Sequence, residues 1–238
     1  MSTENDIRSQ LSLIDITGPI FPGMWDYGAP YFTPKVWSLD FQAWEGGPIY
    51  AEAVSMPLQS GTYLETAAHV FPTRERLGQL PIERTVLVPS ICIYNAVGPR
   101  SALTAAMIEP LVRQVADPPY KGKALLIGTG WSSHWRDADF LTECPYLSED
   151  AIDFVLEHDF AILGGDTPRY DNPYSPTGHL FRFFESETLL LAPLYNLEAV
   201  GNQAGWLIAA PLLISDISAS PVRAVWLGNL GPLAPGPQ

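Results

Sequence analysis

Residues 124–128 (Ala-Leu-Leu-Ile-Gly) and residues 161–166 (Ala-Ile-Leu-Gly-Gly-Asp) decide the fold class. Each is a short apolar run that meets glycine, which is typical of a buried strand. Between them, Ser148 precedes residues 149–158, where apolar residues recur at helical spacing and two acids occupy the first turn. This pattern is typical of a capped helix. The order strand, helix, strand predicts an α/β fold.

The same alternation extends in both directions along the chain. Residues 86–94 predict a buried strand or a pair of strands, and residues 104–115 predict a helix capped by Thr104. Towards the N-terminus, residues 11–17 alternate apolar and polar positions and predict a strand that ends in a turn. Three later apolar runs predict further strands, at residues 189–194, 206–214 and 222–227. We therefore expect an α/β domain with a mainly β N-terminal third.

Residues 24–50 are aromatic, irregular and interspersed with glycine and proline. They favour a packed loop region with short strands over a helix. Their eight aromatic side chains either fill the core or form walls for an apolar substrate.

Composition limits the domain organisation and the overall class. The chain has 238 residues, of which 47% are hydrophobic and 16% charged, so an intrinsically disordered chain is excluded. The 23 prolines make an all-helical bundle a poor fit. Neither an internal repeat nor a linker marks a boundary. We predict a polar lead over residues 1–10, a single domain over residues 11–230 and a flexible tail over residues 231–238.

Charge and cysteine usage bear on partners and location. The formal net charge of −13 repels phosphate backbones and anionic lipids, so we expect neither a nucleic-acid nor a membrane partner. The longest apolar run, residues 205–214, is too short to span a bilayer, and the first residues lack the apolar region of a signal peptide. Cys92 and Cys144 lie far apart without a CxxC pattern, which favours reduced thiols and a cytoplasmic location.

Four histidines are candidates for chemistry. His158 falls in the last turn of a predicted helix, where its cationic form would favour the helix dipole, so we expect a structural role. His134 lies in a loop after Trp131 and is expected at the surface or at the rim of a pocket. His69 and His179 remain as functional candidates.

The stretch that contains His69 carries the strongest chemical signal. Residues 56–72 read Met-Pro-Leu-Gln-Ser-Gly-Thr-Tyr-Leu-Glu-Thr-Ala-Ala-His-Val-Phe-Pro, with Glu65 and His69 four residues apart. A helix would bring these side chains together, and so could a loop. They could act as an acid–base couple or as metal ligands. The structural alternative is a surface glutamate and a buried, hydrogen-bonded histidine.

Residues 59–69 resemble the signature His-x-Gly-Thr-His-x-Asp-x-Pro-x-His of the cyclase family that includes bacterial kynurenine formamidase and isatin hydrolase. The resemblance implies a β/β/α layered domain of the swivelling type. It also implies assembly as a homodimer or homotetramer, with the N-terminal third packed between subunits. Other segments resemble the family in the same order along the chain: residues 14–17, 126–131, 163–168, 178–180 and 220–225.

The chain departs from this family at the metal positions. The resemblance places Gln59, Tyr63 and Glu65 where the family has two histidines and an aspartate that ligate zinc or manganese. It retains His179 and has Leu191 or Ala192 in place of a later glutamate. Glutamine and neutral tyrosine are poor zinc ligands, and aliphatic side chains cannot ligate. We therefore predict no firm cofactor, with zinc or manganese at reduced occupancy if Glu65, His179 and His69 still bind it.

The resemblance also suggests roles for the residues that remain. His69 occupies the position of the family's proton-handling histidine, and imidazole titrates near neutrality. Tyr63 and Gln59 are suitable hydrogen-bond donors, and Glu65 could orient His69 or act as a base if buried. These four side chains are the predicted catalytic group. The predicted substrate contacts are Trp25, Tyr27, Trp131, Asp166 and His179.

Two classes of function follow. The first is an enzyme that acts on a small aromatic or polyketide-like metabolite by histidine acid–base catalysis, through cyclisation, dehydration or isomerisation in secondary metabolism. Hydrolysis of an amide, ester or lactone is the alternative reaction for such an enzyme. The second class is a catalytically inactive, ligand-binding relative, in which Tyr63, Glu65 and His69 would not converge on a cavity.

Overall fold

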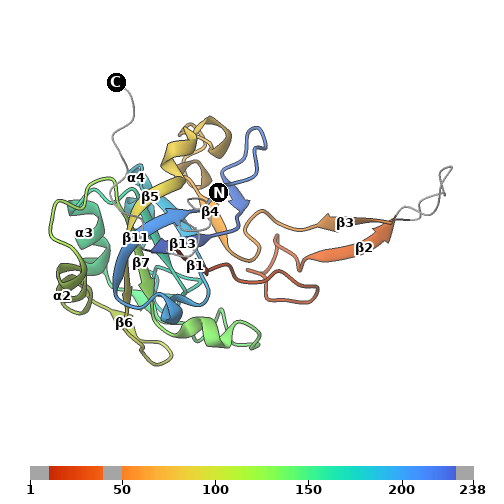
Figure 1. Cartoon of the computed structure of the whole chain (residues 1–238). Helices are drawn as coiled ribbons and strands as arrows, with labels where there is room; N and C mark the ends of the chain where they lie inside the picture. The colour runs from red at the N-terminus through yellow and green to blue at the C-terminus, as the bar shows by residue number, and fades with distance from the viewer. Residues whose placement is uncertain (1–10, 40–49, 229–238) are drawn as a thin grey trace, which may run out of the picture.

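Parallel strands at the centre of a nine-stranded sheet form the frame of the molecule (Figure 1). A computed structural model describes residues 11–39 and 50–228. In chain order its strands and helices are β1 (Ser12–Asp15), β2 (Lys35–Leu39), β3 (Ala51–Ser55), β4 (Tyr63–Glu65), β5 (Val86–Tyr94), β6 (Ala102–Leu103), α2 (Ala105–Val115), β7 (Ala124–Gly128), β8 (Tyr146–Leu147), α3 (Glu149–Glu157), β9 (Ile162–Gly165), α4 (His179–Glu185), β10 (Leu189–Ala192), β11 (Gln203–Ile208), β12 (Ala219–Pro221) and β13 (Val225–Gly228).

The strand order of the large sheet is β1-β13-β11-β5-β7-β9-β10-β4-β12. The pairs β5–β7, β7–β9 and β9–β10 are parallel, and the outer pairs are antiparallel. A parallel pair needs a crossover connection, and the crossovers here contain the helices. The α/β class expected from residues 124–166 is confirmed.

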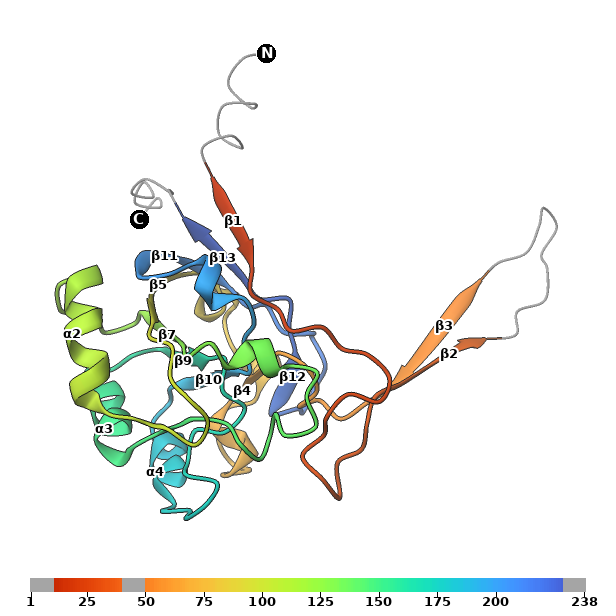
Figure 2. The same cartoon turned by 90° about the horizontal axis from the view of Figure 1, so that it is seen from below.

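Alternation along each central strand divides the core between two faces of the sheet. Leu125 and Ile127 of β7 belong to one buried cluster, whereas Ala124 and Leu126 belong to another. The first cluster also contains the apolar faces of α2, α3 and α4, so these helices cover that face of the sheet (Figure 2). Period-two alternation therefore explains why β7 is apolar at every position.

The second cluster lies on the opposite face and joins side chains from both ends of the sheet. Leu64 of β4 and Trp226 of β13 both pack in it, although their strands are far apart in the strand order. The sheet must therefore curl around this cluster. β4 pairs directly with β10, and the site described below lies beside these two strands.

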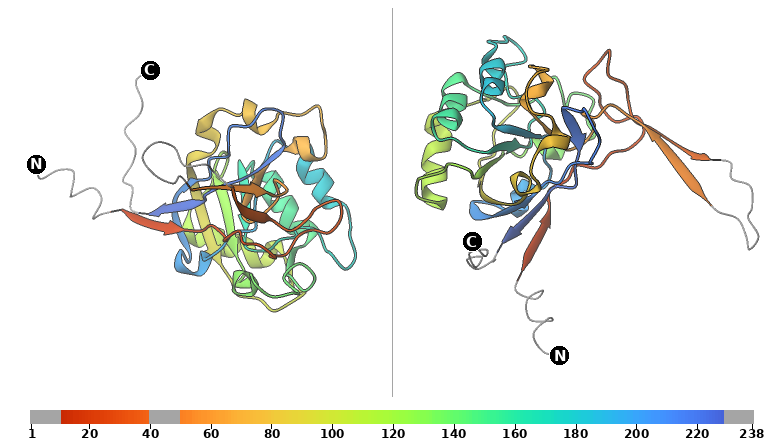
Figure 3. Two further views of the ribbon diagram at one scale, coloured as in Figure 1. Left: turned by 90° about the vertical axis from the view of Figure 1, so that its right-hand side faces the viewer. Right: turned by 90° about the horizontal axis from the view of Figure 1, so that it is seen from above.

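Strands β2 and β3 form a separate hairpin that projects from the body of the molecule (Figures 1 and 3). They pair antiparallel, with Val36 opposite Val54 and Trp37 opposite Ala53. Every residue of β2 is exposed, including Val36, Trp37 and Leu39. We refer to Lys35–Leu39 and Ala51–Ser55 together as the β-arm.

Most predicted elements are confirmed, with three differences. Residues 86–94 form one strand, β5, and not a pair. Only the start of the run at residues 206–214 is a strand, because β11 ends at Ile208, and Leu213 is 89% exposed. Helix α4 was not predicted from the sequence. Of residues 24–50, the structure describes residues 24–39 and 50, which form loop and the strand β2, as expected.

The polar lead at residues 1–10 and the flexible tail expected at residues 231–238 lie outside the described residues. Within the described part of the chain, none of the helices has the length and apolar character that a membrane crossing needs.

Candidate functional site

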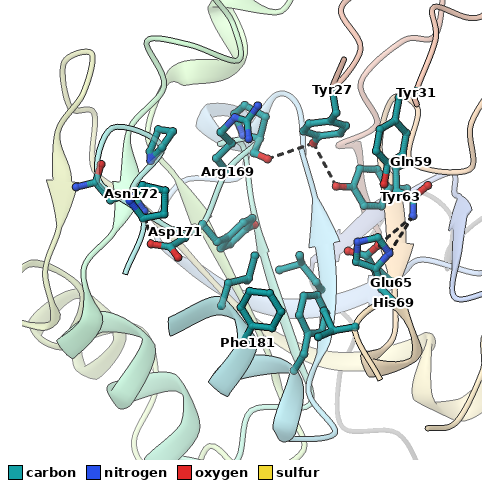
Figure 4. Close-up of a pocket in the computed structure, with 18 residues that line it drawn as sticks. Tyr27, Tyr31, Gln59, Tyr63, Glu65, His69, Arg169, Asp171, Asn172 and Phe181 are labelled. Carbon is teal, nitrogen blue, oxygen red and sulfur yellow. Dashed lines mark hydrogen bonds and ion pairs between the residues drawn. The ribbon is translucent and has the colours of Figure 1, made fainter. Parts of the chain in front are cut away.

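A cavity of about 460 Å³ lies beside β4 and β10, next to the segment that follows the carboxyl end of β9 (Figure 4). That volume is within the usual range for small-molecule sites. Five parts of the chain line it: the aromatic loop with Tyr27 and Tyr31, the segment from Gln59 to Val70, residues 168–176, helix α4, and Leu190 of β10.

Glu65 and His69 meet through a strand followed by a tight turn. Glu65 is the last residue of β4, and His69 ends a 3-10 helix formed by Ala67–His69. Thr66 caps this helix, because its side chain accepts a hydrogen bond from the Ala68 N–H at 3.3 Å. Glu65 and His69 are therefore not on one regular helix, and the alternative of a loop that brings them together is closer to the structure.

The Gly-Thr pair before β4 anchors this segment. Gly61 has a φ of +65°, and a Cβ at this position would lie 2.4 Å from the Ile20 side chain. The buried hydroxyl of Thr62 donates to the Pro193 carbonyl at 2.6 Å and accepts from the Gly18 N–H at 2.8 Å. These contacts join the N-terminal segment, β4 and the end of β10, so they hold one wall of the cavity in place.

Gln59, Glu65 and His69 form a polar triad. Oε1 of Glu65 lies 3.1 Å from Nδ1 of His69 and accepts a hydrogen bond from Nε2 of Gln59 at 3.2 Å. The Gln59 amide nitrogen is also 3.4 Å from the histidine Nδ1. Two proton positions satisfy this geometry: Nδ1–H donates to an ionised Glu65, or a protonated Glu65 donates to Nδ1. The pair can therefore hold one proton on either residue.

Burial favours the uncharged forms of both Glu65 and His69. Glu65 is 3% exposed, and loss of solvation raises its pKa to about 7, against the opposing effect of the Gln59 hydrogen bond. The His69 side chain is 35% exposed, and its partial burial lowers its pKa below 6.5. A carboxylic acid that titrates near pH 7 next to an imidazole can both accept and return a proton under physiological conditions.

The hydroxyl of Tyr63 is hydrogen-bonded to the hydroxyl of Tyr27. Its OH lies 3.2 Å from that of Tyr27, which donates to the Pro168 carbonyl at 3.1 Å. Because the Tyr27 proton goes to Pro168, the Tyr63 hydroxyl donates to Tyr27. Burial raises the pKa of both phenols, so neither is an acid near pH 7. In this arrangement Tyr63 positions the wall, and its proton is not directed at the cavity.

Three predicted substrate contacts lie away from the cavity. Asp166 is fully buried and accepts hydrogen bonds from the backbone N–H groups of Thr129 and Gly130 and from the Thr129 hydroxyl. Burial raises its pKa to about 6, although these hydrogen bonds favour the carboxylate. Trp131 is buried, and Trp25 stacks on Phe140 in the same aromatic cluster. Asp166 and Trp131 are core residues, and the partly buried Trp25 lines a separate cavity, so none of the three predicted contacts lies at the cavity beside β4.

His179 is buried behind the wall of the cavity and does not line it. It is the first residue of α4 and is 5% exposed. Its Nδ1 is hydrogen-bonded to the Thr177 hydroxyl, and its Nε2 lies 3.3 Å from the Tyr170 carbonyl. Both ring nitrogens of His179 therefore have partners within the protein, and the predicted contact of His179 with substrate does not follow from this position.

The donors at this cavity do not match a zinc or manganese site. Glu65 and His69 offer two ligands, Gln59 is a poor third, and both His179 nitrogens are engaged. Leu191 and Ala192, at the family's glutamate position, are buried core residues. Within residues 11–39 and 50–228, one group of three potential ligands lies within 4.8 Å of one another, and it is elsewhere: His134, Asp137 and Asp139.

The sequence did not point to several residues that line the cavity. Arg169 directly follows the motif at residues 163–168, where the comparison with the family pattern stopped. Phe181 and Phe184 belong to α4, and the Phe184 ring lies 6.2 Å from that of His69. The spacing of three between Phe181 and Phe184 was the available signal, because residues three apart share one face of a helix. Of the eight aromatics between residues 24 and 50, Tyr27 and Tyr31 line the cavity, whereas Phe41 and Trp44 lie outside the described residues.

Solved structures of several enzymes share this fold. An isatin hydrolase bound to the product analogue thioisatinate superposes with a TM-score of 0.81 at 19% identity, covering 95% of this chain and 99% of the other. Isatin hydrolase A from Labrenzia aggregata, bound to benzyl benzoate, gives 0.80 at 20% identity, with the same coverage of 95% and 99%. A potential metal-dependent hydrolase with cyclase activity gives 0.70 at 19% identity, covering 91% and 98%. At these identities the similarity shows a common α/β fold.

A family model described as "Putative cyclase" matches residues 14–172, about two thirds of the chain. The matched part includes the Gly-Thr pair, the Glu65–His69 pair and the central strands β5, β7 and β9. The fold and the sequence therefore agree, and the chain belongs to the Cyclase family.

Proposed function

We propose that this chain is an enzyme that converts a small aromatic or polyketide-like metabolite by general acid–base catalysis at Glu65 and His69. The reaction class that we favour is cyclisation, dehydration or isomerisation. The observation that carries the proposal is the contact of 3.1 Å between Glu65 and His69 at the wall of the cavity, with a glutamate pKa of about 7.

The chemistry proceeds by proton movement within this pair. An ionised Glu65 accepts a proton from a substrate C–H or O–H group, directly or through His69. The carboxylic acid or imidazolium so formed returns the proton to another atom of the substrate. Gln59 holds Glu65 in place and donates to its charged form. General acid–base catalysis is most effective when the pKa lies near the working pH, which is the case for Glu65.

The position of His69 argues against the inactive alternative. An inactive relative would be expected to bury Tyr63, Glu65 and His69 away from any cavity. All three residues instead line the same cavity, and the His69 side chain is 35% exposed. This convergence supports an enzyme over a ligand-binding relative.

Hydrolysis of an amide, ester or lactone is a second candidate, because the same base could remove a proton from water. A base with a pKa of about 7 can do so at neutral pH without a metal-bound hydroxide. The isatin hydrolases share the fold at 19–20% identity, so isatin, a cyclic amide, is a reasonable first probe for this chain.

The experiment that tests the proposal uses a panel of small aromatic lactams, lactones and hydroxylated ketones, starting with isatin, in H₂¹⁸O. Mass spectrometry of the products separates the two candidates, because hydrolysis adds one water molecule to the substrate, whereas isomerisation adds none and dehydration removes one. Reactions without the protein correct for the exchange of ketone oxygens with the solvent. We expect turnover to fall at least about a hundredfold in Glu65→Gln and His69→Ala. His134→Ala, a histidine outside this cavity, is the matched control. Full turnover in His69→Ala would refute the role of that residue.

We further propose that the protein is a cytoplasmic homodimer or homotetramer in which the β-arm packs against a second copy. An isolated two-stranded hairpin is at best marginally stable in water, and the exposed Trp37 and Leu39, which share one face of the β-arm, need a cover. A second copy is a suitable occupant, since a symmetric dimer would cover both arms at once. The buried free thiols of Cys92 and Cys144 support a reducing location.

A further inference from the structure

Arg169 is a half-buried cation on the wall of the cavity. Its Nε donates a hydrogen bond to the Leu141 carbonyl at 3.1 Å, and its Cζ lies 5.7 Å from the centre of the Tyr27 ring. These two contacts fix the plane of the guanidinium. Within the described residues, neither terminal nitrogen, Nη1 or Nη2, has a hydrogen-bond partner.

The charge of Arg169 is not neutralised by the protein. No carboxylate of the described residues lies within 4.0 Å of its guanidinium. Most other arginines of the described chain do have such a partner: Arg74, Arg84, Arg100, Arg113, Arg182 and Arg223. Partial burial of a cation without a counterion costs free energy. An anion that enters the cavity would recover that cost.

The two acids of the cavity do not fill this role. Asp171 accepts hydrogen bonds from the backbone N–H groups of Asn172, Thr177 and Gly178. Glu65 is engaged with Gln59 and His69. Arg169 is the one lysine or arginine among the described residues that line the cavity, so its guanidinium is free to bind a ligand.

The cavity places this cation apart from the acid–base pair. In the view of Figure 4, Arg169 lies beside Tyr27, whereas Glu65 and His69 lie beneath Tyr63, on the opposite wall from Arg169. Tyr27, Tyr31 and Phe181 provide aromatic surface along the cavity. A flat molecule could therefore reach Arg169 with one end and the acid–base pair with the other.

We propose that Arg169 is a specificity residue that binds the carboxylate of an aromatic substrate, whose ring rests on Tyr27 and Phe181 and whose reacting end faces Glu65 and His69. The planar fork of a guanidinium matches a carboxylate in a bidentate manner. The inference rests on the proposed function for the identity of the reacting end, but the anion site itself can be tested without turnover.

Binding of 2-naphthoate and 2-naphthamide to the full chain, measured by titration calorimetry, tests the proposal. The two probes have similar shapes and differ in charge. We expect the wild type to prefer the carboxylate by about tenfold to a hundredfold, which is the range for a charge-assisted hydrogen bond. Arg169→Gln should remove this preference and leave amide binding unchanged, whereas Arg169→Lys should retain part of it.

Arg136→Gln is the matched control. Arg136 lies over the Phe21 ring, 4.1 Å from its centre, in a different cavity, so its loss should leave the preference intact. Unchanged amide binding shows that Arg169→Gln is folded. A preference that persists in Arg169→Gln, equal affinities in the wild type, or binding of neither probe would each overturn the proposal. His69→Ala separates this result from the proposed function, because it should lower turnover at least about a hundredfold and keep the preference for the carboxylate. If His69→Ala keeps full turnover, the proposed function fails, whereas the result for Arg169 stands.

Discussion

Glu65 is a buried carboxyl group whose charged form is disfavoured in the folded protein. It is 3% exposed, and burial raises its pKa from 4.5 to about 7. The folded state therefore binds this proton more tightly than the unfolded chain does. Between these two pH values the unfolded state holds fewer protons, so the contribution of Glu65 to the free energy of unfolding is present below pH 4.5 and is lost as the pH rises through 7.

The first prediction concerns this pH dependence. Glu65→Gln keeps the shape of the side chain and removes its titration, so the loss of stability between pH 4.5 and 8 should be smaller in the variant by about 3 kcal/mol. Urea denaturation across that range measures it. Glu157→Gln, on the exposed side of α3, is the control and should run parallel to the wild type. Parallel curves for Glu65→Gln and the wild type would show that Glu65 titrates normally.

The sequence identified the residues of the acid–base pair but not their geometry. The spacing of Glu65 and His69 is compatible with a helix, whereas the chain follows β4 and then a 3-10 turn. The difference arises because the Thr66 N–H pairs with the Ser218 carbonyl, a contact over 150 positions away that local spacing cannot show. Asp166 failed as a substrate contact for a similar reason, since its partners Thr129 and Gly130 belong to another strand end.

At the scale of elements, the local sequence pattern was sufficient to predict a helix or strand where its buried positions follow a clear pattern. β7 and α3 were predicted within one residue, because one is apolar throughout and the other has a clear cap and periodicity. The short helix α4 was missed, since its seven residues give too few turns for a periodic signal. The run after β11 was misjudged because apolar content alone does not show burial, and Leu212 and Leu213 are exposed.

The β-arm is the element whose surface is hardest to explain in a single chain. Its pairing places Trp37 and Leu39 on the same face, with Ala51 and Ala53 opposite them. That face is apolar except at its base, where Lys35 is opposite Ser55, whereas the other face carries Ser38 and Glu52 beside two valines. An apolar face on a projecting hairpin invites association, and a second copy of the chain is the partner that we propose.

The second prediction tests this assembly. Replacing both Trp37 and Leu39 by serine should shift the protein from a dimer or tetramer to a monomer, because the apolar face of the β-arm is lost. Light scattering coupled to size-exclusion chromatography measures the mass directly. Ser38→Ala, on the opposite face, should leave the mass unchanged. A monomeric wild type, or an oligomeric double variant, would contradict the assembly.

At the scale of the whole molecule, the site depends on how the sheet curls. The cavity combines residues near positions 27, 65, 169 and 181, which meet because β9, β10 and β4 are neighbours in the sheet. The strand order is a property of the folded chain, so neither composition nor spacing could predict which aromatics would line the cavity. Family resemblance supplied the positions of the pair, and the structure added Arg169 and α4.

The positions of the possible metal-ligating side chains among the described residues predict the metal content of the protein. The cavity offers Glu65 and His69 with no strong third ligand, whereas His134, Asp137 and Asp139 form a group at the surface. We expect protein purified without chelator to hold well below one equivalent of zinc or manganese by inductively coupled plasma mass spectrometry. Any ion that binds should be lost in His134→Ala and kept in His69→Ala. Near-stoichiometric metal that disappears in His69→Ala or Glu65→Gln would show instead that the cavity retains a metal site, and that the reaction should be considered with that ion in place.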